Sequence, residues 1–367
     1  MNEFSVDAAG LAGLSRQLAR AAEDAFDVLD YTKRQCDLDW PAEGLLMKML
    51  GPHDHVYASV TGALGRLQDL TAGASGQVAL ALDDYTDTDR AAAARLDAAY
   101  PQARVSAYPQ GADPLGGDGL ALAGVTPGHA AFADVAVPGE HLTDPGVVGA
   151  APMWSINPLT DLVSPAAWLR QVTITLFGHD PFDGWARALS GDWASYVHCG
   201  AALARVGDGA YDIGRNLLAG AADAAGVWQG NAADAERDFQ VSLGDATTSF
   251  RGACSSFAGL YGQAADAVSS LRDVAGDLIT GLLDALIMVN LASAVGTALI
   301  ETGVGALAGY GVAAYYAGQA YQLYQEIARC YSTAEDLFEA LGAAIGSVNA
   351  DLDVPDLPSV SPYRYSA

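Results

Sequence analysis

The chain has 367 residues, of which 51% are hydrophobic and 17% charged, and its formal net charge is -26. That apolar fraction is enough to form a packed core and excludes a disordered protein. The 18 Lys and Arg residues are outnumbered by 44 Asp and Glu residues, which argues against a nucleic-acid partner. The N-terminal sequence MNEFSVDAAG has neither a basic stretch nor an apolar run, so we expect no Sec-type signal peptide.

Apolar residues recur every three or four positions over residues 5–36 and again over about 56–99, which predicts two amphipathic helices. The run WPAEGLLMKMLGPHDH lies between them, and its prolines and glycines interrupt the pattern. We therefore expect a turn there. These elements together predict an antiparallel helical hairpin over residues 1–100.

Prolines and glycines recur through residues 101–165, where the helical period is lost, and this predicts a linker or strap between two helical parts. The helical period resumes near residue 182 and continues to about 271, with one interruption at Trp228-Gln229-Gly230. Asn231 is suited to cap the helix that follows the interruption. The tripeptide is thus predicted to be the elbow of a second hairpin, in which Trp228 fills the space between the helix ends.

The remaining sequence is a strongly apolar segment at 275–325, an amphipathic helix up to about residue 352 and a Pro-rich tail at 353–367. We place the apolar segment in one helical domain with the second hairpin, over residues 166–352. No stretch of any length shows the alternation of a strand. The predicted fold class is therefore all-α: an elongated bundle of two long helical hairpins, with a C-terminal apolar hairpin.

Two uncharged stretches in the apolar segment have lengths close to a bilayer. The sixteen residues after Asp284 and the twenty-four after Glu301 would span about 24 and 36 Å as helices, against about 30 Å of hydrocarbon. Asn290, Gln319 and Gln322 weaken a transmembrane interpretation. We expect this hairpin to pack in the bundle, and insertion into a membrane remains the alternative.

Two long helices joined by a Trp-x-Gly elbow resemble the WXG family of type VII (ESX) secretion substrates, with VWQGNAADA as the turn motif and residues 180–272 as the matching part. In the first hairpin, Tyr85-x-x-x-Asp89 looks like the YxxxD/E export signal of these systems, and residues 1–101 resemble the EspC-like group. Positions i and i+4 share a helix face, so the phenol and the carboxylate would form one patch. The order of the two hairpins is similar to the fused, EspB-like arrangement of paired PE and PPE proteins.

The resemblance implies a non-enzymatic effector or structural partner, made in the cytoplasm and exported to the cell surface or beyond by an actinobacterial type VII system. Tyr85, Asp89, Trp228 and Gly230 would be read as one composite signal by the secretion machinery, including its ATPase and a chaperone. A delivery module for a separately encoded toxin, a homo-oligomer and a membrane-active protein are the alternatives left open.

We identify no arrangement of residues typical of catalysis, no cofactor motif and no metal site. The His53-Asp54-His55 triplet is interpreted as part of a turn, since its ligands would point in different directions. Cys199 and Cys254 lie on the apolar stripes of the two helices that flank the elbow. Their similar distance from the elbow predicts a disulfide, with two buried thiols as the alternative.

Overall fold

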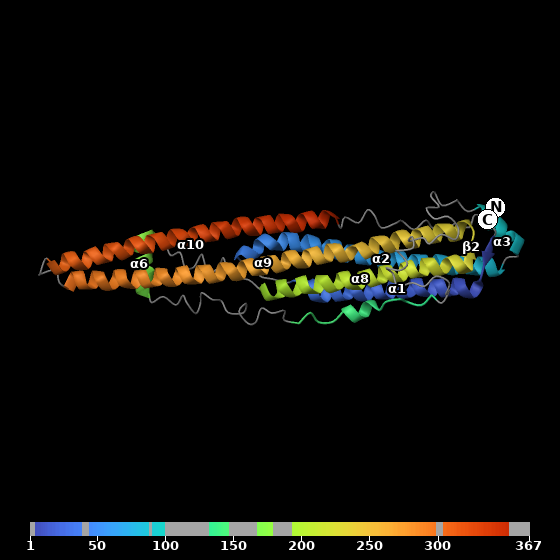
Figure 1. The fold of residues 1–367 in the computed structure, drawn as a ribbon, viewed down its shortest axis with the longest axis horizontal. Helices are drawn as coiled ribbons and strands as arrows, with labels where there is room; N and C mark the ends of the chain where they lie inside the picture. The colour runs from blue at the N-terminus through green and yellow to red at the C-terminus, as the bar shows by residue number, and fades with distance from the viewer. Residues whose placement is uncertain are drawn as a thin grey trace.

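The structure is a computed structural model and describes residues 4–38, 44–87, 90–99, 132–146, 167–178, 193–298 and 304–351. Helices account for most of this part of the chain, and the strands found in it are two residues long. The long helices lie side by side along the longest axis of the molecule (Figure 1). The predicted all-α fold class is confirmed.

The first hairpin is formed by α1 (Ala8–Cys36) and α2 (Met47–Asp87), followed by the short α3 (Arg90–Ala99). Helix α1 begins after Asp7, whose carboxylate accepts a hydrogen bond from the backbone N–H of Ala9 at 3.0 Å. A short 3-10 helix, η1 (Gly44–Leu46), leads into α2.

The prediction of a turn around Pro52 is wrong, because helix α2 runs through this proline. A proline inside a helix leaves the carbonyl four residues earlier, here that of Lys48, without its usual N–H donor. Helix α10 (Val304–Asp351) packs against this point of α2 through a glycine. A Cβ on Gly342 would lie 3.2 Å from Cγ of Pro52 and 3.3 Å from the Lys48 oxygen. Packing of α10 against Pro52 and the Lys48 carbonyl thus accompanies the continuous helix.

The second hairpin consists of α8 (Trp193–Val227) and α9 (Asn231–Ala298), joined by the two-residue strand β2 (Trp228–Gln229). Three glycines of α8, each seven residues from the next, allow the two helices to approach closely. Added Cβ atoms on them would lie 2.6–2.7 Å from side-chain carbons of α9: Gly200 from Tyr261, Gly207 from Cys254 and Gly214 from Thr248. The spacing of seven residues keeps these glycines on one face of α8.

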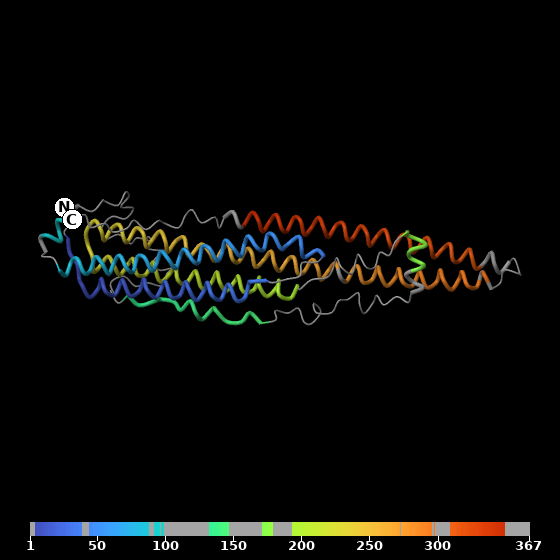
Figure 2. The backbone as a smooth tube through the Cα atoms, turned by 180° about the vertical axis from the view of Figure 1, so that it is seen from behind, coloured from blue at the N-terminus to red at the C-terminus, as the bar shows by residue number. Residues whose placement is uncertain are grey.

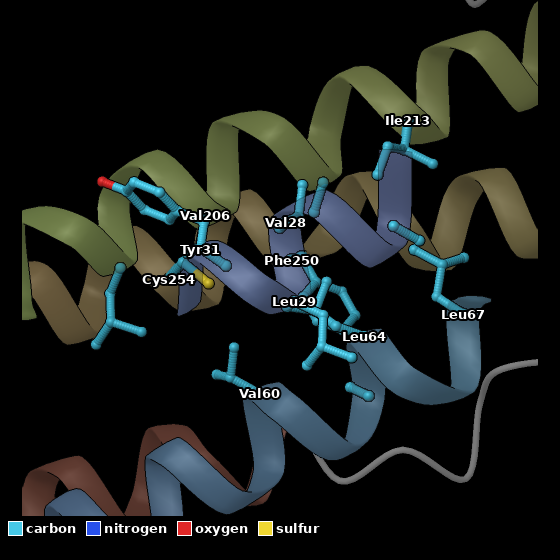
Figure 3. Close-up of a cluster of buried hydrophobic side chains, with 14 of the residues drawn as sticks. Val28, Leu29, Tyr31, Val60, Leu64, Leu67, Val206, Ile213, Phe250 and Cys254 are labelled. Atoms are coloured by element: carbon cyan, nitrogen blue, oxygen red, sulfur yellow. The ribbon is translucent and has the colours of Figure 1, made fainter. Parts of the chain in front are cut away.

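One continuous core joins the two hairpins. Side chains of α1, α2, α8 and α9 converge on it, and all the residues labelled in the close-up are buried (Figure 3). Helix α10 contributes its C-terminal half to the same core through Phe338 and Ile345. The first hairpin is therefore held to the second by burial of apolar surface, which is the main favourable contribution to folding.

The described part of the predicted strap, residues 132–146, lies against α1 and α8 (Figure 1). Phe132 is buried, and its ring occupies the space where a Cβ on Gly13 would be, 2.7 Å from its Cδ2. The amide oxygen of Asn216 accepts hydrogen bonds from the backbone N–H groups of Val135 and Ala136 at 2.9 and 3.0 Å. The short 3-10 helix η2 (Pro138–His141) continues this contact. This segment is packed in place by specific polar contacts.

The C-terminal part of α9 and the N-terminal half of α10 extend past the ends of α8 and α2. The short helix α6 (Ala167–Phe177) crosses this extended pair (Figures 1 and 2). The two long helices do pair with each other, with Gly281 of α9 close to Leu323 of α10. The expectation that this apolar hairpin packs in the bundle is wrong for its outer faces. Leu291 is 57% exposed and Tyr315 is 62% exposed, because no third long helix in the described part of the chain covers the pair there.

Candidate recognition site at the helical elbow

The elbow between α8 and α9 is held by the N-terminal strand of the chain. Strand β1 (Ser5–Val6) pairs antiparallel with β2, with Ser5 opposite Gln229 and Val6 opposite Trp228. The backbone N–H of Asp7 also donates a hydrogen bond to the carbonyl of Val227 at 2.8 Å. The last backbone groups of α8 and the first after it therefore find partners more than two hundred residues away in sequence.

Gly230 has a φ of 139°, a conformation that residues with a Cβ rarely adopt. Space is a second reason for glycine, because a Cβ at this position would lie 2.5 Å from Oδ2 of Asp97. The Asp97 carboxylate accepts hydrogen bonds from the backbone N–H groups of Asn231 and Ala232 at 3.0 and 3.1 Å. Gly230 thus allows a carboxylate from α3 to reach the N-terminus of α9.

This arrangement corrects the prediction that Asn231 caps α9. The Asn231 side chain instead donates a hydrogen bond to the backbone carbonyl of Asp97 at 3.2 Å, and Asp97 supplies the cap. A carboxylate at a helix N-terminus is favoured by the helix dipole and by the free N–H groups. Sequence reasoning missed Asp97 because it lies 134 residues before its partner, and no local pattern marks a cap of this kind.

The structure brings Tyr85 and Trp228 together. Their ring centroids lie 6.2 Å apart in an edge-to-face arrangement, and the ring of Phe4 lies 5.3 Å from that of Tyr85. Such pairs of aromatic rings add to the stability that burial of their area provides. Trp228 is 4% exposed, so its indole fills the space at the helix ends as expected. We call Tyr85, Asp97, Trp228 and Gly230 the elbow junction.

The expectation that Tyr85 belongs to a patch presented on the surface is wrong for the phenol, which is 7% exposed. Asp89, its predicted partner in the motif, lies outside the described residues. The carboxylate that the structure places at the elbow is that of Asp97. The side chains exposed next to the junction are those of Thr86, Asp87 and Gln229. The aromatic residues therefore shape this end of the bundle, and polar neighbours form its surface.

Two side chains of the first turns of α9, those of the buried Gln240 and the half-buried Glu236, have buried polar atoms without a partner among the described residues. Both amide atoms of Gln240 and one carboxyl oxygen of Glu236 lack a hydrogen bond, as does the indole N–H of Trp228. Burial raises the pKa of Glu236 to about 8. A buried polar group without a partner costs about 1–3 kcal/mol, so this end of α9 holds polar groups whose hydrogen-bonding capacity is unused.

The register of the second hairpin does not fit the predicted Cys199–Cys254 disulfide. Cys254 is level with Gly207, eight residues from Cys199, which is about 12 Å along a helix. A disulfide needs a Cα separation under about 7 Å. Gly200 lies opposite Tyr261, so the helices turn at residues 230–231. The midpoint of Cys199 and Cys254 in the sequence lies four residues before this turn. In an antiparallel pair an offset of four residues at the turn separates the two cysteines by eight residues along the helices.

Cys199 instead lies beside Cys36, the last residue of α1. The Cys36 thiol is 3.8 Å from the Cys199 carbonyl oxygen. Burial, together with this neighbouring thiol, raises the pKa of Cys199. Cys199 is therefore a protonated thiol at neutral pH, because its burial disfavours the thiolate, which is the reactive form of cysteine.

His53 also lies in this buried region and not in a turn. Its Nδ1 is 2.6 Å from the Tyr261 hydroxyl, and its Nε2 is 3.2 Å from the carbonyl oxygen of Cys36. The ring of Tyr261 stacks on that of Tyr196 at 4.2 Å. Burial lowers the pKa of His53, so the imidazole is neutral and hydrogen-bonded within the core. We interpret this group as a structural connection between α2 and the second hairpin.

Among the described residues, no group of three His, Cys, Asp or Glu side chains could hold a metal ion. The fold and the elbow junction define a class of protein in general terms: two helical hairpins packed together, whose ends meet around an aromatic pair and a shared carboxylate cap. No protein-family model, curated protein or solved structure matched this chain.

Proposed function

We propose that this chain is a non-enzymatic substrate of an actinobacterial type VII (ESX) secretion system, exported as a folded helical protein. In this proposal the secretion machinery, its ATPase included, reads the end of the bundle where the elbow junction lies. The function follows from the resemblance of Tyr85-x-x-x-Asp89 and Trp228-Gln229-Gly230 to the two export motifs of such substrates.

The observation that carries the proposal is the edge-to-face contact of Tyr85 and Trp228 at 6.2 Å. The two residues are 143 positions apart, and each belongs to a motif that is unspecific alone. Their contact is what a single composite signal requires when one chain supplies both halves. If each hairpin resembled a secretion substrate only by itself, there would be no reason for Tyr85 and Trp228 to be in contact.

The burial of both rings assigns them an indirect role in recognition. Tyr85 and Trp228 set the shape of the junction, while the machinery contacts the polar residues around it. Gln229 and Asp87 are exposed there, and Asp89 is close in sequence. A substitution at a buried ring must therefore be separated from simple loss of folding.

Export can be measured in an actinobacterial strain that encodes the secretion ATPase and in an isogenic strain without it. The informative variants are Asp89→Asn, which removes the motif's charge, and Trp228→Phe, which keeps an aromatic ring at the junction. Asp83→Asn is the matched control, since Asp83 is an exposed carboxylate of the same helix α2. The unfolding midpoint of each purified variant in urea shows whether folding is preserved.

We expect the wild type and Asp83→Asn to appear in the culture filtrate only when the ATPase is present. Asp89→Asn and Trp228→Phe should accumulate in the cell although their folded state persists. Export that does not depend on the ATPase would refute the proposed function. Normal export of both variants would refute the composite signal.

A further inference from the structure

The strongest unexplained feature lies at the opposite end of the molecule from the elbow. We call residues 285–298 of α9 and 304–325 of α10 the apolar arm. The two helices pair with each other there: the hydroxyl groups of Thr297 and Tyr310 lie 3.3 Å apart near the tip. Figures 1 and 2 both show the pair extending beyond α8, α2 and α1. The elbow junction and the export motifs make no use of this arm.

Large apolar side chains lie on the outward faces of both helices of the arm, interrupted by exposed amides such as those of Asn290 and Gln322. Between the helices, a small core including Leu282, Leu286 and Ala320 is buried. On the sides turned away from this core, large apolar residues are 39–62% exposed: Ile287, Leu291, Val295, Tyr310, Val312 and Tyr315. A helix that is apolar on all sides is typical of a protein interior or a bilayer, since water solvates it poorly. Among the described residues, no further long helix encloses this arm.

The arm is also almost free of charge in a strongly acidic protein. From residue 285 to residue 325 the sequence contains one charged residue, Glu301, which lies outside the described residues. The sixteen uncharged residues after Asp284 would measure about 24 Å as a helix, compared with about 30 Å for the hydrocarbon layer of a bilayer. Within the described residues, α9 is the one helix long and apolar enough to cross a membrane, and 33% of its most apolar window is buried.

Aromatic residues and a crossing helix mark the base of the arm. Tyr321 is 52% exposed and lies near the level of Asp284, as judged from the pairing of Gly281 with Leu323. Phe177, at the end of α6, stacks on Tyr324 with ring centroids 4.6 Å apart. Helix α6 runs across α9 and α10 at this point (Figures 1 and 2). Tyrosines are enriched at the interface of a bilayer, where an apolar ring and a polar hydroxyl are both accommodated.

We propose that the apolar arm inserts into the hydrocarbon layer of a lipid bilayer, to a depth limited by Asp284 and α6. The backbone of the arm is compatible with lipid because the N–H and C=O groups of its helices bond to one another. A second copy of the chain would cover one side of the arm, whereas lipid covers all the outward faces. The net charge of -26 repels anionic headgroups, so the bilayer in question has zwitterionic headgroups.

Insertion of the arm into lipid can be measured independently of export, with purified protein and vesicles alone. The test is flotation of the full chain with vesicles of phosphatidylcholine, in parallel with vesicles that also contain an anionic lipid. The arm variants are Leu291→Asp on α9 and Tyr315→Asp on α10, which place a charge on two different outward faces. Leu80→Asp is the matched control, since Leu80 is 54% exposed on α2 in the body of the molecule.

We expect the wild type and Leu80→Asp to float with phosphatidylcholine vesicles, and to bind less well when anionic lipid is added at low salt. Each arm variant should lose about a hundredfold in partitioning, the effect of a carboxylate within hydrocarbon. Glu301→Gln removes the one charge between the two uncharged stretches and should strengthen binding. Circular dichroism and the urea midpoint of each variant confirm that the helices are intact.

Three results would overturn the proposal. The first is a wild-type protein that stays at the bottom of the gradient with every vesicle. The second is binding that Leu291→Asp and Tyr315→Asp leave unchanged. The third is lipid-free self-association, seen by analytical ultracentrifugation, that both arm variants abolish, because a second copy would then be the partner of the arm.

Discussion

The substitution Gly230→Ala tests how the elbow junction is built. The added Cβ would lie 2.5 Å from Oδ2, 2.7 Å from Cγ and 2.7 Å from Oδ1 of Asp97. The carboxylate must therefore move, and the N–H groups of Asn231 and Ala232 then lose their acceptor. A residue other than glycine is also strained at a φ of 139°.

The expected loss of stability can be assembled from these effects. Backbone strain at such a position costs about 1–3 kcal/mol. Loss of a helix N-cap costs about 1–2 kcal/mol. We therefore expect Gly230→Ala to lower the free energy of unfolding by about 2–5 kcal/mol. Asp97→Ala, which removes the cap without the strain, should cost less.

Urea unfolding followed by far-UV circular dichroism measures both changes. Gly226→Ala is the matched control, because Gly226 lies in the last turn of α8, has no positive φ and has nothing within 4 Å of an added Cβ. It should be neutral or stabilise by up to about 1 kcal/mol.

The double variant should cost less than the sum of the single variants, since removing the Asp97 carboxylate also removes the clash. Equal stabilities of Gly230→Ala and Gly226→Ala, or strict additivity with Asp97→Ala, would refute this account of the glycine.

Further predictions concern the helix seam, the thiols and a buried carboxyl. Gly214→Ala should lower the free energy of unfolding, measured in urea, by about 1–3 kcal/mol, because its Cβ would lie 2.6 Å from Cγ2 of Thr248. A loss no larger than that of the control variant Gly226→Ala contradicts the close approach of α8 and α9. Cys36 and Cys199 should react with a small disulfide only after the protein is unfolded in urea, because both thiols are buried; labelling of these two cysteines in the folded protein, identified by peptide mapping, contradicts this. The pKa of Glu236 is raised to about 8 from about 4.3 in an unfolded chain, so stability should fall as pH rises between these values; Glu236→Gln should remove that dependence, and an unchanged pH profile would show that another group is responsible.

The helices themselves could be predicted because their signals are local. The apolar period of three to four residues marked α1, most of α2, α8 and α9, and the tripeptide Trp228-Gln229-Gly230 marked the elbow. In this tripeptide the glycine indicated a backbone conformation that other residues rarely adopt, and the tryptophan indicated a space between the helix ends that its indole fills. The continuation of α2 through Pro52 could not be predicted in this way, because the packing that accompanies it comes from Gly342 of a distant helix.

The candidate site was predicted in part for the same reason. Tyr85 and Trp228 each stood in a recognisable motif, but their motifs did not reveal that both rings are buried. Asp97 carried no local signal at all. The cap that it forms depends on α3 folding back onto the elbow, which is a consequence of how the two hairpins dock.

The sequence by itself determined the helical segments, the break between α8 and α9 and the uncharged length of the apolar arm, because each depends on neighbours within a few residues. The tertiary structure alone decided the register of α8 on α9, and with it that Cys199 lies beside Cys36 and eight residues from the level of Cys254. It also decided that the arm extends past the other helices. Both outcomes depend on where helices end relative to one another, and a one-residue change at a turn shifts an antiparallel pairing by two residues along the partner helix.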